Sequence, residues 1–410
     1  MFGTLADFDA LIAQAHQMNI RVMIDLVLSH TSDQHAWFKE SRNGRENARS
    51  DWYVWADAKP DGSPPNNWLS IFGGSAWEWD GGRMQYYLHN FLREQPDLNF
   101  HNIDVQDALL DVARFWLERG VDGFRLDTVN FYVHDAELRD NPALSNDQNN
   151  SAIAPSVNPY TFQNHLYDKS RPENLDFLAR LRGVMDEFED ITAVGEVGDD
   201  QRGLEILPEY TEGSTSQHMC YGFDFLSSTF PTGTRIAEVL ERFQRIAPDS
   251  WACWAFSNHD VVRHTSRWAL APAAHRAYLA VLMSLRGSVC LYQGEELGLH
   301  EAYVGFEDLQ DPYGIRFWPT FKGRDGCRTP MAWNSEREHG GFSDGKPWLP
   351  VAIEHEHLAV DAQERDPGSM LHFYRAMIAY RETRPELVKG GFEMVTADEN
   401  FLAMILSLIH

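Results

Sequence analysis

Residues 120–127 read Gly120-Val121-Asp122-Gly123-Phe124-Arg125-Leu126-Asp127, and the sequence around them indicates a helix that leads into a strand. The amphipathic run over 105–119 ends at Gly120, a residue typical of the position just after a helix. The apolar residues that follow predict a strand with an aspartate at its tip. On a strand Arg125 and Asp127 point to the same side, where the guanidinium favours the ionised carboxylate. A structural ion pair explains this octapeptide equally well.

Two more acidic residues end apolar segments of the same kind. Residues 191–198 predict a strand that ends at Glu196, and residues 251–260 predict one that ends at His259 and Asp260. Glu196 has no neighbouring cation in the sequence, which favours a raised pKa for its carboxyl group. Three acids at three strand ends predict one shared site.

Helices and strands are expected to alternate along most of the chain. We expect helices at 4–18, with Thr4 as N-cap, and at 105–119, 175–188, 235–245, 274–285 and 369–384. We expect strands at 20–28, which we predict to be buried, and at 120–127, 191–196, 219–225, 251–260 and 288–292. Six strands in βα alternation, with polar residues at their C-terminal ends, predict a TIM (β/α)8 barrel.

A barrel has eight strands, so we expect this chain to lack the first two. Residues 31–99 are rich in aromatic residues, Gly and Pro and too long for an ordinary loop, which predicts a small inserted domain after the third barrel strand. The barrel is then expected over 1–30 and 100–385, with a polar loop at 135–172, and a C-terminal β domain is expected to begin at 386–410.

Composition narrows the range of partners. The 35 basic and 61 acidic residues give a net charge of -26, which disfavours nucleic acid and anionic membranes because either would be repelled. Four scattered cysteines are too few for a disulfide framework or a metal site. No leader peptide is evident, and no uninterrupted apolar run approaches about 18 residues. We therefore expect a cytoplasmic protein with a small-molecule substrate.

The motifs resemble those of the α-amylase superfamily, glycoside hydrolase family 13, and within it those of bacterial α-glucosidases and oligo-1,6-glucosidases. Six segments carry the resemblance, in family order: Asp25-Leu26-Val27-Leu28-Ser29-His30, Gln95-Pro96-Asp97-Leu98-Asn99, Gly123-Phe124-Arg125-Leu126-Asp127, Gly195-Glu196-Val197, Phe256-Ser257-Asn258-His259-Asp260 and Arg324-Asp325-Gly326-Cys327-Arg328-Thr329-Pro330-Met331. Ser29 stands where the family usually has Asn. Relatives begin further upstream and end in a β-sandwich, so the chain resembles a piece truncated at both ends. Relatives bind Ca or Mg through a loop that would lie upstream of Met1, so we expect no metal ligands and no cofactor in this chain.

The resemblance implies a retaining glycosidase with Asp127 as nucleophile, Glu196 as general acid/base and Asp260 as the carboxylate that grips sugar hydroxyls. The expected substrate-binding residues are His30, Phe72, Phe91, Arg125, Thr128, His259 and Arg328. Simple core packing explains Phe72 and Phe91 equally well. Asp25 has the opposite strand parity from His30, so on a regular strand both cannot face the same side, and we assign it at most a supporting role.

Thr128 after the nucleophile and the long loop at 135–172 imply an exo-acting α-glucosidase for α-1,4 bonds of short oligosaccharides, with α-1,6 bonds left open. One alternative is a transglycosylase, a sucrose isomerase or a trehalose synthase of the same family. Another is an inactive truncated product. A non-catalytic transporter subunit would usually lose the catalytic carboxylates and carry a membrane segment, whereas this sequence keeps all three acids.

Overall fold

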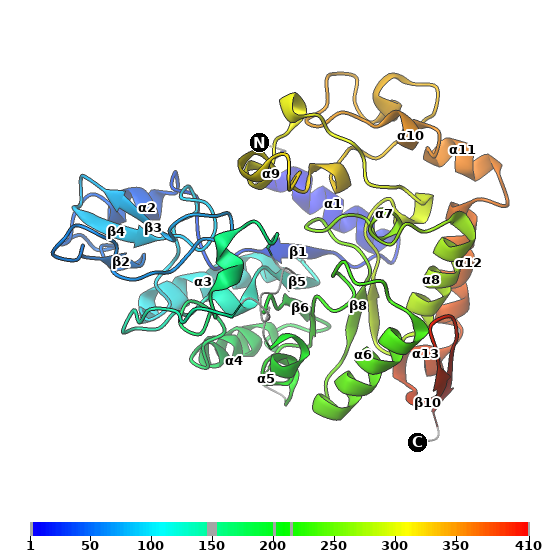
Figure 1. The fold of residues 1–410 in the computed structure, drawn as a ribbon, viewed down its shortest axis with the longest axis horizontal. Coiled ribbons are helices and arrows are strands. Elements are labelled where there is room, and N and C mark those ends of the chain that lie inside the picture. Colours follow the sequence, from blue (N-terminus) through cyan, green and yellow to red (C-terminus); the bar gives the residue numbers. More distant parts are fainter. Residues whose placement is uncertain (1–2, 146–153, 200–201, 214–215, 409–410) are drawn as a thin grey trace. The chain divides into compact units, whose positions relative to one another are not determined.

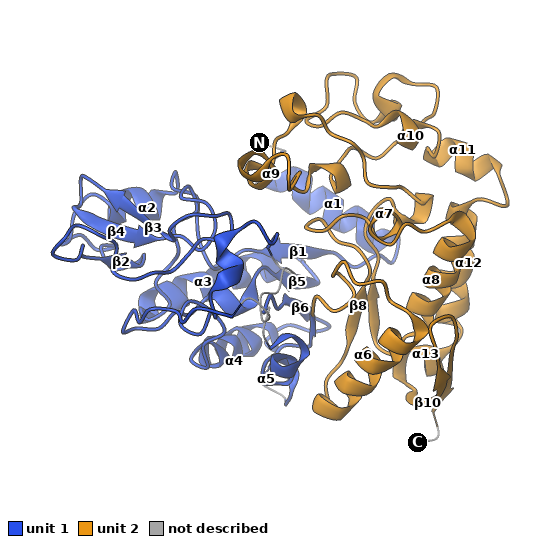
Figure 2. Ribbon diagram, viewed as in Figure 1, with its two compact units in different colours: residues 1–221 blue, residues 222–410 orange. Residues whose placement is uncertain are grey.

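The computed structural model describes residues 3–145, 154–199, 202–213 and 216–408 (Figure 1). The chain divides into two compact units, residues 1–221 and 222–410 (Figure 2). The predicted acidic strand ends fall in both units: Asp127 and Glu196 belong to the first, and Asp260 belongs to the second. Each unit is therefore described by itself.

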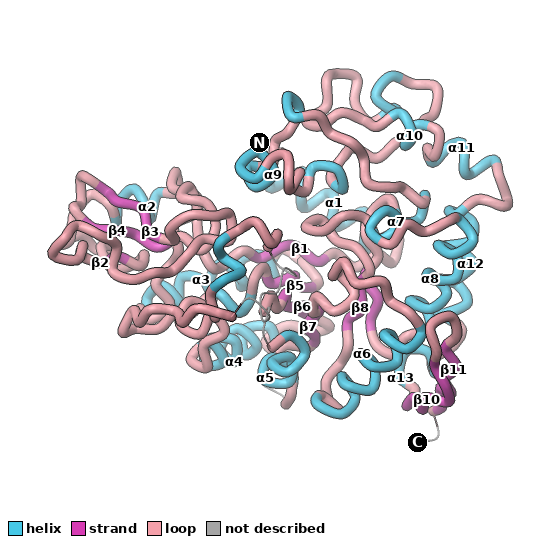
Figure 3. The backbone as a smooth tube through the Cα atoms, in the orientation of Figure 1, coloured by secondary structure: helices cyan, strands magenta, loops and turns pink. Residues whose placement is uncertain are grey.

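The first unit contains a parallel sheet of four strands, in the order β1-β5-β6-β7 (Figure 3). Its strands are β1 (Met23–Leu26), β5 (Gly123–Leu126), β6 (Thr192–Glu196) and β7 (Met219–Tyr221). The register pairs Leu26 with Leu126, Leu126 with Gly195, and Glu196 with Tyr221. The C-terminal ends of these strands are therefore level, which places the residues at their tips along one edge.

The first unit has five α-helices among its described residues, and local sequence signals mark the start of the first and the end of the third. The helices are α1 (Leu5–Gln17), α2 (Ala36–Ser41), α3 (Ile103–Glu118), α4 (Asn174–Met185) and α5 (Leu207–Thr211). Thr4 caps α1 as predicted, in a capping box with Asp7 that satisfies two free backbone N–H groups. After α3, Gly120 adopts a φ of 90°, which glycine tolerates and other residues rarely do. The chain can therefore turn at once into β5.

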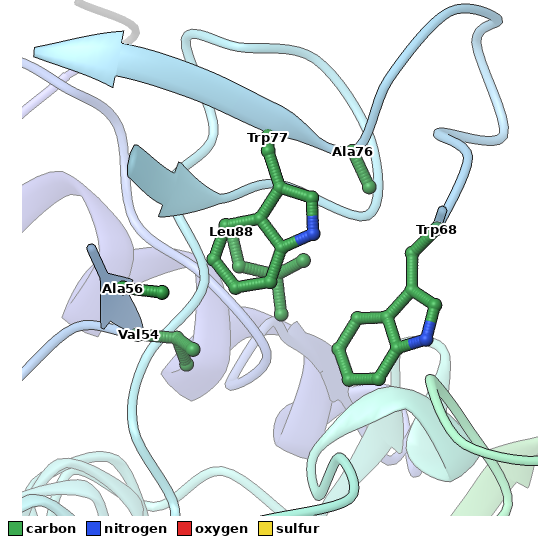
Figure 4. Packing of buried hydrophobic residues seen from close by; sticks show 6 residues of the cluster. All are labelled: Val54, Ala56, Trp68, Ala76, Trp77 and Leu88. Atoms are coloured by element: carbon green, nitrogen blue, oxygen red, sulfur yellow. The ribbon is translucent and has the colours of Figure 1, made fainter. Parts of the chain in front are cut away.

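Residues 31–99 contain a small antiparallel sheet of their own, in the order β2-β4-β3. Its strands are β2 (Trp55–Ala56), β3 (Trp77–Asp80) and β4 (Gln85–Leu88). Six buried residues pack together beside this sheet (Figure 4), namely Val54, Ala56, Trp68, Ala76, Trp77 and Leu88. The Asn66 side chain joins two of them, because its Oδ1 accepts hydrogen bonds from Trp77 Nε1 at 2.7 Å and from the Trp68 backbone N–H at 3.1 Å.

The second unit contains a parallel pair of strands and an antiparallel hairpin. The parallel pair is β8 (Cys253–Ala255) with β9 (Ser288–Cys290), and the hairpin is β10 (Gly391–Ala397) with β11 (Leu402–Ser407). The long helices are α6 (Gly233–Ile246), α8 (Pro272–Ser284) and α12 (Met370–Glu382). Loops and short helices make up most of the connection over 298–369 (Figure 3). The short helices of this unit are α7 (His264–Arg267), α9 (Pro312–Phe317), α10 (Ile353–Glu356), α11 (Val360–Arg365) and α13 (Pro385–Lys389).

The six predicted strands and six predicted helices are all present, although most strands are shorter than expected. The prediction that residues 20–28 are buried is wrong in part, because β1 is an edge strand of its sheet and Met23 is 38% exposed. The predicted loop at 135–172 contains a 3-10 helix at Pro159–Phe162, and its residues 146–153 lie outside the described part of the chain. Among the described residues, no helix combines the length and apolar character needed to cross a bilayer.

Candidate active site

One guanidinium joins three carboxylates at the strand ends of the first unit. Arg125 Nη1 donates to Asp25 Oδ1 at 2.8 Å and to Asp127 Oδ1 at 2.5 Å, while Nη2 donates to Glu196 Oε2. Nη2 also lies 3.3 Å from the Tyr221 hydroxyl. Asp25, Asp127, Glu196 and Tyr221 come from the ends of four neighbouring strands, so the sheet brings them together around a single cation.

The parallel register explains why Arg125 reaches residues on both sides of its strand. Arg125 pairs with Asp25 on β1 and with Val194 on β6, two residues before Glu196. Its side chain is only 15% exposed. Burial opposes the charge, but the carboxylates of Glu196, Asp127 and Asp25 outweigh it and raise the pKa of Arg125 above its ordinary value. The guanidinium is therefore a permanent positive charge within this group of acids.

The sequence shows no cation near Glu196, but the structure places Arg125 beside it. Its side chain is 5% exposed, and its Oε2 accepts from Arg125 Nη2 and lies 3.5 Å from the Thr128 backbone N–H. Arg125 reaches Glu196 because residues 125 and 196 lie on adjacent strands although 71 positions separate them in the chain. Arg125 therefore binds both carboxylates, and the absence of a neighbouring cation no longer favours a raised pKa for Glu196.

Thr128 connects the same two carboxylates from the other side. Its hydroxyl donates to Asp127 Oδ2 at 3.1 Å, so both oxygens of Asp127 accept hydrogen bonds. Thr128 has φ 40° and ψ 50°, a left-handed conformation that a β-branched residue adopts only under strain of about 1–3 kcal/mol. The strain lies directly after the predicted nucleophile and turns the chain sharply into a 3-10 helix at Val129–Phe131.

Asp25 contacts the site despite the parity argument that separated it from His30. Both of its carboxylate oxygens lie within 3.0 Å of Arg125 Nη1. The regular strand ends at Leu26, so side-chain alternation does not extend from Asp25 to His30. The geometry thus gives Asp25 the supporting contact that the sequence could only suggest.

His30 is held as a neutral imidazole in one tautomer. The Leu92 backbone N–H donates to Gln95 Oε1 at 3.1 Å, which turns the amide nitrogen of Gln95 toward His30 Nε2 at 2.9 Å. Because an amide nitrogen only donates, Nε2 accepts, and Nδ1 carries the proton and donates to Ser29 Oγ at 2.9 Å. Burial lowers the pKa of His30 to about 4, although the charge of Asp127 opposes the shift.

The two aromatic candidates belong to a packed cluster. Phe91 is 8% exposed and lies 5.5 Å from the His30 ring and 5.4 Å from the Phe131 ring, measured between centroids. Phe72 is half-buried and lies 6.0 Å from Phe91. Core packing accounts for most of the surface of Phe91, whereas Phe72 keeps part of its ring exposed.

In the second unit, two arginines contact the carboxylate of Asp260, whereas in the first unit one arginine contacts three carboxylates. Arg324 Nη1 and Arg328 Nη2 each donate to Asp260 Oδ1 at 2.8 Å, and His259 Nε2 lies 3.2 Å from Asp260 Oδ2. Burial acts to raise the pKa of Asp260, but the charges of His259, Arg324 and Arg328 outweigh it and lower the pKa. Arg328 Nε also donates to the His259 carbonyl at 2.7 Å, which fixes the backbone beside Asp260. The predicted residues of this unit therefore lie together.

Sequence reasoning missed Arg324 and Tyr221. Arg324 binds Asp260 with one nitrogen and Asp311 with two others, at 3.0 and 2.9 Å. Its place four residues before Arg328 in the same motif was the available signal. Tyr221 ends β7 opposite Glu196, but the strand was expected to run to residue 225, so its tip was misplaced. Within the part of the chain that the structure describes, no group of three or more His, Cys, Asp or Glu side chains could hold a metal ion, and the expectation about metals stays a prediction.

Comparison with known proteins identifies the family. Residues 1–390 match the family described as "Alpha amylase, catalytic domain". A probable alpha-glucosidase of Rhizobium meliloti is 64% identical over 99% of this chain and 74% of its own length. An oligo-1,6-glucosidase of Heyndrickxia coagulans is 32% identical over 98% of this chain and 76% of its own. The chain therefore belongs to the α-amylase family of glycoside hydrolases.

Solved structures agree with this assignment. An alpha-glucosyl transfer enzyme, XgtA, superimposes with a TM-score of 0.95 at 53% identity, over 98% of this chain and 75% of its own. The trehalulose synthase MutB of Pseudomonas mesoacidophila gives a TM-score of 0.87 at 30% identity, over 100% of this chain and 76% of its own. The chain has the α-amylase family fold, a TIM barrel with a C-terminal β domain, and it is an enzyme of the glycosidase class.

Proposed function

We propose that this enzyme is a retaining, exo-acting α-glucosidase that cleaves α-1,4 bonds of short oligosaccharides, with α-1,6 bonds as a second substrate class. The observation that carries the proposal is the single guanidinium of Arg125, which contacts both Asp127 and Glu196. A retaining glycosidase needs two carboxyl groups on either side of one glycosidic bond. The relatives named alpha-glucosidase and oligo-1,6-glucosidase support the choice of substrate.

In the first step Glu196 gives its proton to the glycosidic oxygen, the aglycone leaves, and an Asp127 oxygen bonds to the anomeric carbon. The Asp127 oxygen that Thr128 holds is the easier one to free, because its donor is an uncharged hydroxyl at 3.1 Å, whereas the other oxygen accepts from the Arg125 cation at 2.5 Å. The bond to Arg125 then remains on the other oxygen, which becomes the ester carbonyl. In the second step Glu196 takes a proton from water, and the hydroxide attacks the anomeric carbon and releases Asp127.

Arg125 serves both steps as a fixed counter-charge. Without this cation, the negative charges of Asp25, Asp127 and Glu196 would repel one another whenever Glu196 is ionised. A buried cation that is already in place needs no rearrangement when charge moves between Asp127 and Glu196. Asp25 orients this cation from the β1 side.

The remaining predicted residues are assigned to sugar binding. Asp260, with His259 and Arg328, grips hydroxyl groups near the reacting carbon, and His30 offers a neutral imidazole to the same sugar. Phe72 contributes the exposed part of its ring, and Phe91 supports His30 from behind. In this proposal residues 1–30 and 100–385 form the catalytic barrel, residues 31–99 the inserted domain, and residues 386–410 the start of the C-terminal domain. The chain's own side chains carry the chemistry, without a cofactor.

A second candidate is transfer of glucose to a sugar instead of water. The similarity to an alpha-glucosyl transfer enzyme and to a trehalulose synthase favours it. Both reactions share the first step and differ in the acceptor that attacks the glucosyl ester.

The test is incubation of the purified chain with maltose, isomaltose and sucrose, followed by NMR of the first products. From sucrose, whose leaving group is fructose, we expect α-glucose to appear first, and we expect a 5-fluoro-α-glucosyl fluoride to label the peptide that contains Asp127. Initial release of β-glucose, or a label on another residue, would overturn the retaining mechanism. Oligosaccharides or isomerised sucrose as main products would favour the second candidate, and a chain without any turnover would favour an inactive product.

A further inference from the structure

The side chain of Asn130 binds the backbone of Gly198, two residues after Glu196. Asn130 lies three residues after Asp127, in the 3-10 helix Val129–Phe131, and is fully buried. Its Oδ1 accepts from the Gly198 N–H at 3.1 Å, and its Nδ2 donates to the Gly198 carbonyl at 2.9 Å. The carboxamide thus pairs with Gly198 as a neighbouring strand would pair with it.

The orientation of this carboxamide is fixed by a third hydrogen bond. Asn130 Nδ2 also donates to Ser170 Oγ at 2.9 Å, and the Ser170 backbone N–H donates to the Asn130 carbonyl at 2.6 Å. A flipped amide would place a donor against the Gly198 N–H and an acceptor against its carbonyl. Asn130 therefore holds one conformation, with its donors and acceptor all engaged.

A buried lysine binds the same carbonyl from another direction. Lys169 is 2% exposed, and its Nζ donates to the Gly198 carbonyl at 3.2 Å. The ammonium group lies 5.2 Å from the centre of the Phe131 ring and 5.4 Å from that of Tyr160, within the range of cation–π attraction. Ser170 Oγ in turn donates to Asp199 Oδ2 at 2.8 Å, so side chains bind both Gly198 and Asp199 in the segment after Glu196.

These contacts begin where the sheet stops supporting the chain. β6 ends at Glu196, and the next ladder bond, from the Val197 N–H to the Tyr221 carbonyl, is already 3.4 Å long. Beyond that point Asn130 supplies the partner that the sheet no longer offers. The backbone on both sides of Glu196 is consequently fixed, on one side by β5 and β7 and on the other by the segment that follows Asp127.

We propose that Asn130 is a positioning residue for the general acid: it sets the direction of Glu196 relative to Asp127 by clamping the Gly198 peptide. This inference rests on the proposed roles of Glu196 and Asp127. It assigns to Asn130 an effect on the protonation of the leaving group and little effect on the attack by Asp127. Lys169 assists by holding the same carbonyl.

The test compares two substrates that differ in their need for an acid. Maltose requires protonation of its leaving group, whereas α-glucosyl fluoride releases fluoride almost without it. For Asn130→Leu, which removes all three side-chain hydrogen bonds at similar volume, we expect kcat/KM on maltose to fall about 30-fold, within the range of general acid catalysis, and that on α-glucosyl fluoride to fall less than about threefold. Equal losses on both substrates would overturn the proposal.

A double-variant cycle separates this inference from the proposed function. Glu196→Gln alone should reduce the maltose rate far more than the fluoride rate, and adding Asn130→Leu should then leave the ratio of the two rates unchanged. If Glu196→Gln alone does not change the ratio, the proposed role of Glu196 fails. If it does, and Asn130→Leu changes the ratio further in that background, only the role of Asn130 fails.

Two further variants guard against loss of folding. Lys169→Met keeps the Asn130 clamp but removes one donor, and we expect a change of the ratio in the same direction of about threefold; no change would count against the clamp. Asn66→Leu is the matched control, because Asn66 is a buried asparagine that also makes three hydrogen bonds, to Leu138, Trp68 and Trp77. It should lower the melting temperature without changing the ratio, and a changed ratio would show that loss of stability alone produces the effect.

Discussion

The two carboxylate clusters of this enzyme have inverse charge arrangements. In the first unit three carboxylates share the single guanidinium of Arg125. In the second unit the Asp260 carboxylate accepts from two guanidinium groups, one of which, Arg324, also binds Asp311. An acid-rich cluster favours proton exchange and nucleophilic attack, because small changes in charge are felt by several groups. A carboxylate between two arginines is fixed and suits the binding of hydroxyl groups.

The first prediction removes the shared cation. Arg125→Met leaves Asp25, Asp127 and Glu196 without a counter-charge, so we expect kcat/KM on maltose to fall by about a thousand-fold or more, at the strong end for loss of one charged group in an active site. The low-pH limb of the activity profile should move to higher pH, because carboxylates that repel one another take up a proton more readily. Steady-state kinetics from pH 4 to pH 8 measure both effects. A loss below about tenfold would contradict the central role of Arg125.

The second prediction concerns Glu301, a largely buried acid whose Oε2 accepts from the Arg263 backbone N–H. Burial raises the pKa of Glu301 to about 7, although the Arg263 N–H and the charges of Arg263 and Arg267 act against it. The folded pKa lies above the ordinary 4.5, so the protonated group contributes its full stability below about pH 4.5 and loses it as pH rises through 7.

Glu301→Gln should therefore lose less stability than the parent enzyme between pH 5 and pH 8, by about 3 kcal/mol in the free energy of unfolding. Urea titrations at several pH values measure this difference. Parallel curves for the two proteins would show that Glu301 titrates normally.

The third prediction removes the two cations of the second cluster one at a time. Arg328→Met leaves Asp260 with one guanidinium, so we expect about a tenfold rise in KM, as for loss of one charge-assisted hydrogen bond. Arg324→Met should cost more, because it also removes the cation that the buried Asp311 carboxylate binds. The double variant should lose more than the product of the two, because Asp260 then keeps no guanidinium and only His259 remains beside it. Complete inactivation by one single variant would remove the contrast with Arg125.

The smallest effect is expected at Thr128. Thr128→Val removes the hydrogen bond to Asp127 Oδ2 at similar size, which should lower kcat by about threefold, a small effect for a hydrogen bond to a carboxylate because the bond is 3.1 Å long. Thr128→Ser keeps the hydroxyl and serves as the control. Equal rates for the valine and serine variants would show that the hydroxyl does not act on the nucleophile.

Local sequence patterns were sufficient to place Arg125, Asp127 and Glu196 at the ends of their strands. The predicted strand over 120–127 and the two-residue spacing of Arg125 and Asp127 are confirmed by β5 and by the 2.5 Å ion pair. The end of β6 at Glu196 is confirmed as well. These features depend on neighbours in the chain, so hydrophobic periodicity and side-chain alternation reveal them.

Contacts across strands could not be predicted in the same way. Arg125 reaches Glu196 and Asp25 because of the strand order β1-β5-β6, which no local pattern specifies. The hydrogen bonds of Asn130 to Gly198 depend on two loops that follow different strands. The parity argument for Asp25 failed because it assumed a strand longer than β1. That Asp260 shares a site with Asp127 and Glu196 stays a prediction.

The left-handed backbone of Thr128 sets heat resistance against activity at this position. Glycine would adopt the same conformation without strain, so a single exchange would make the protein more resistant to heat. The same exchange would delete the hydroxyl group that touches the nucleophile. Stability against heat and turnover therefore place opposite demands on residue 128.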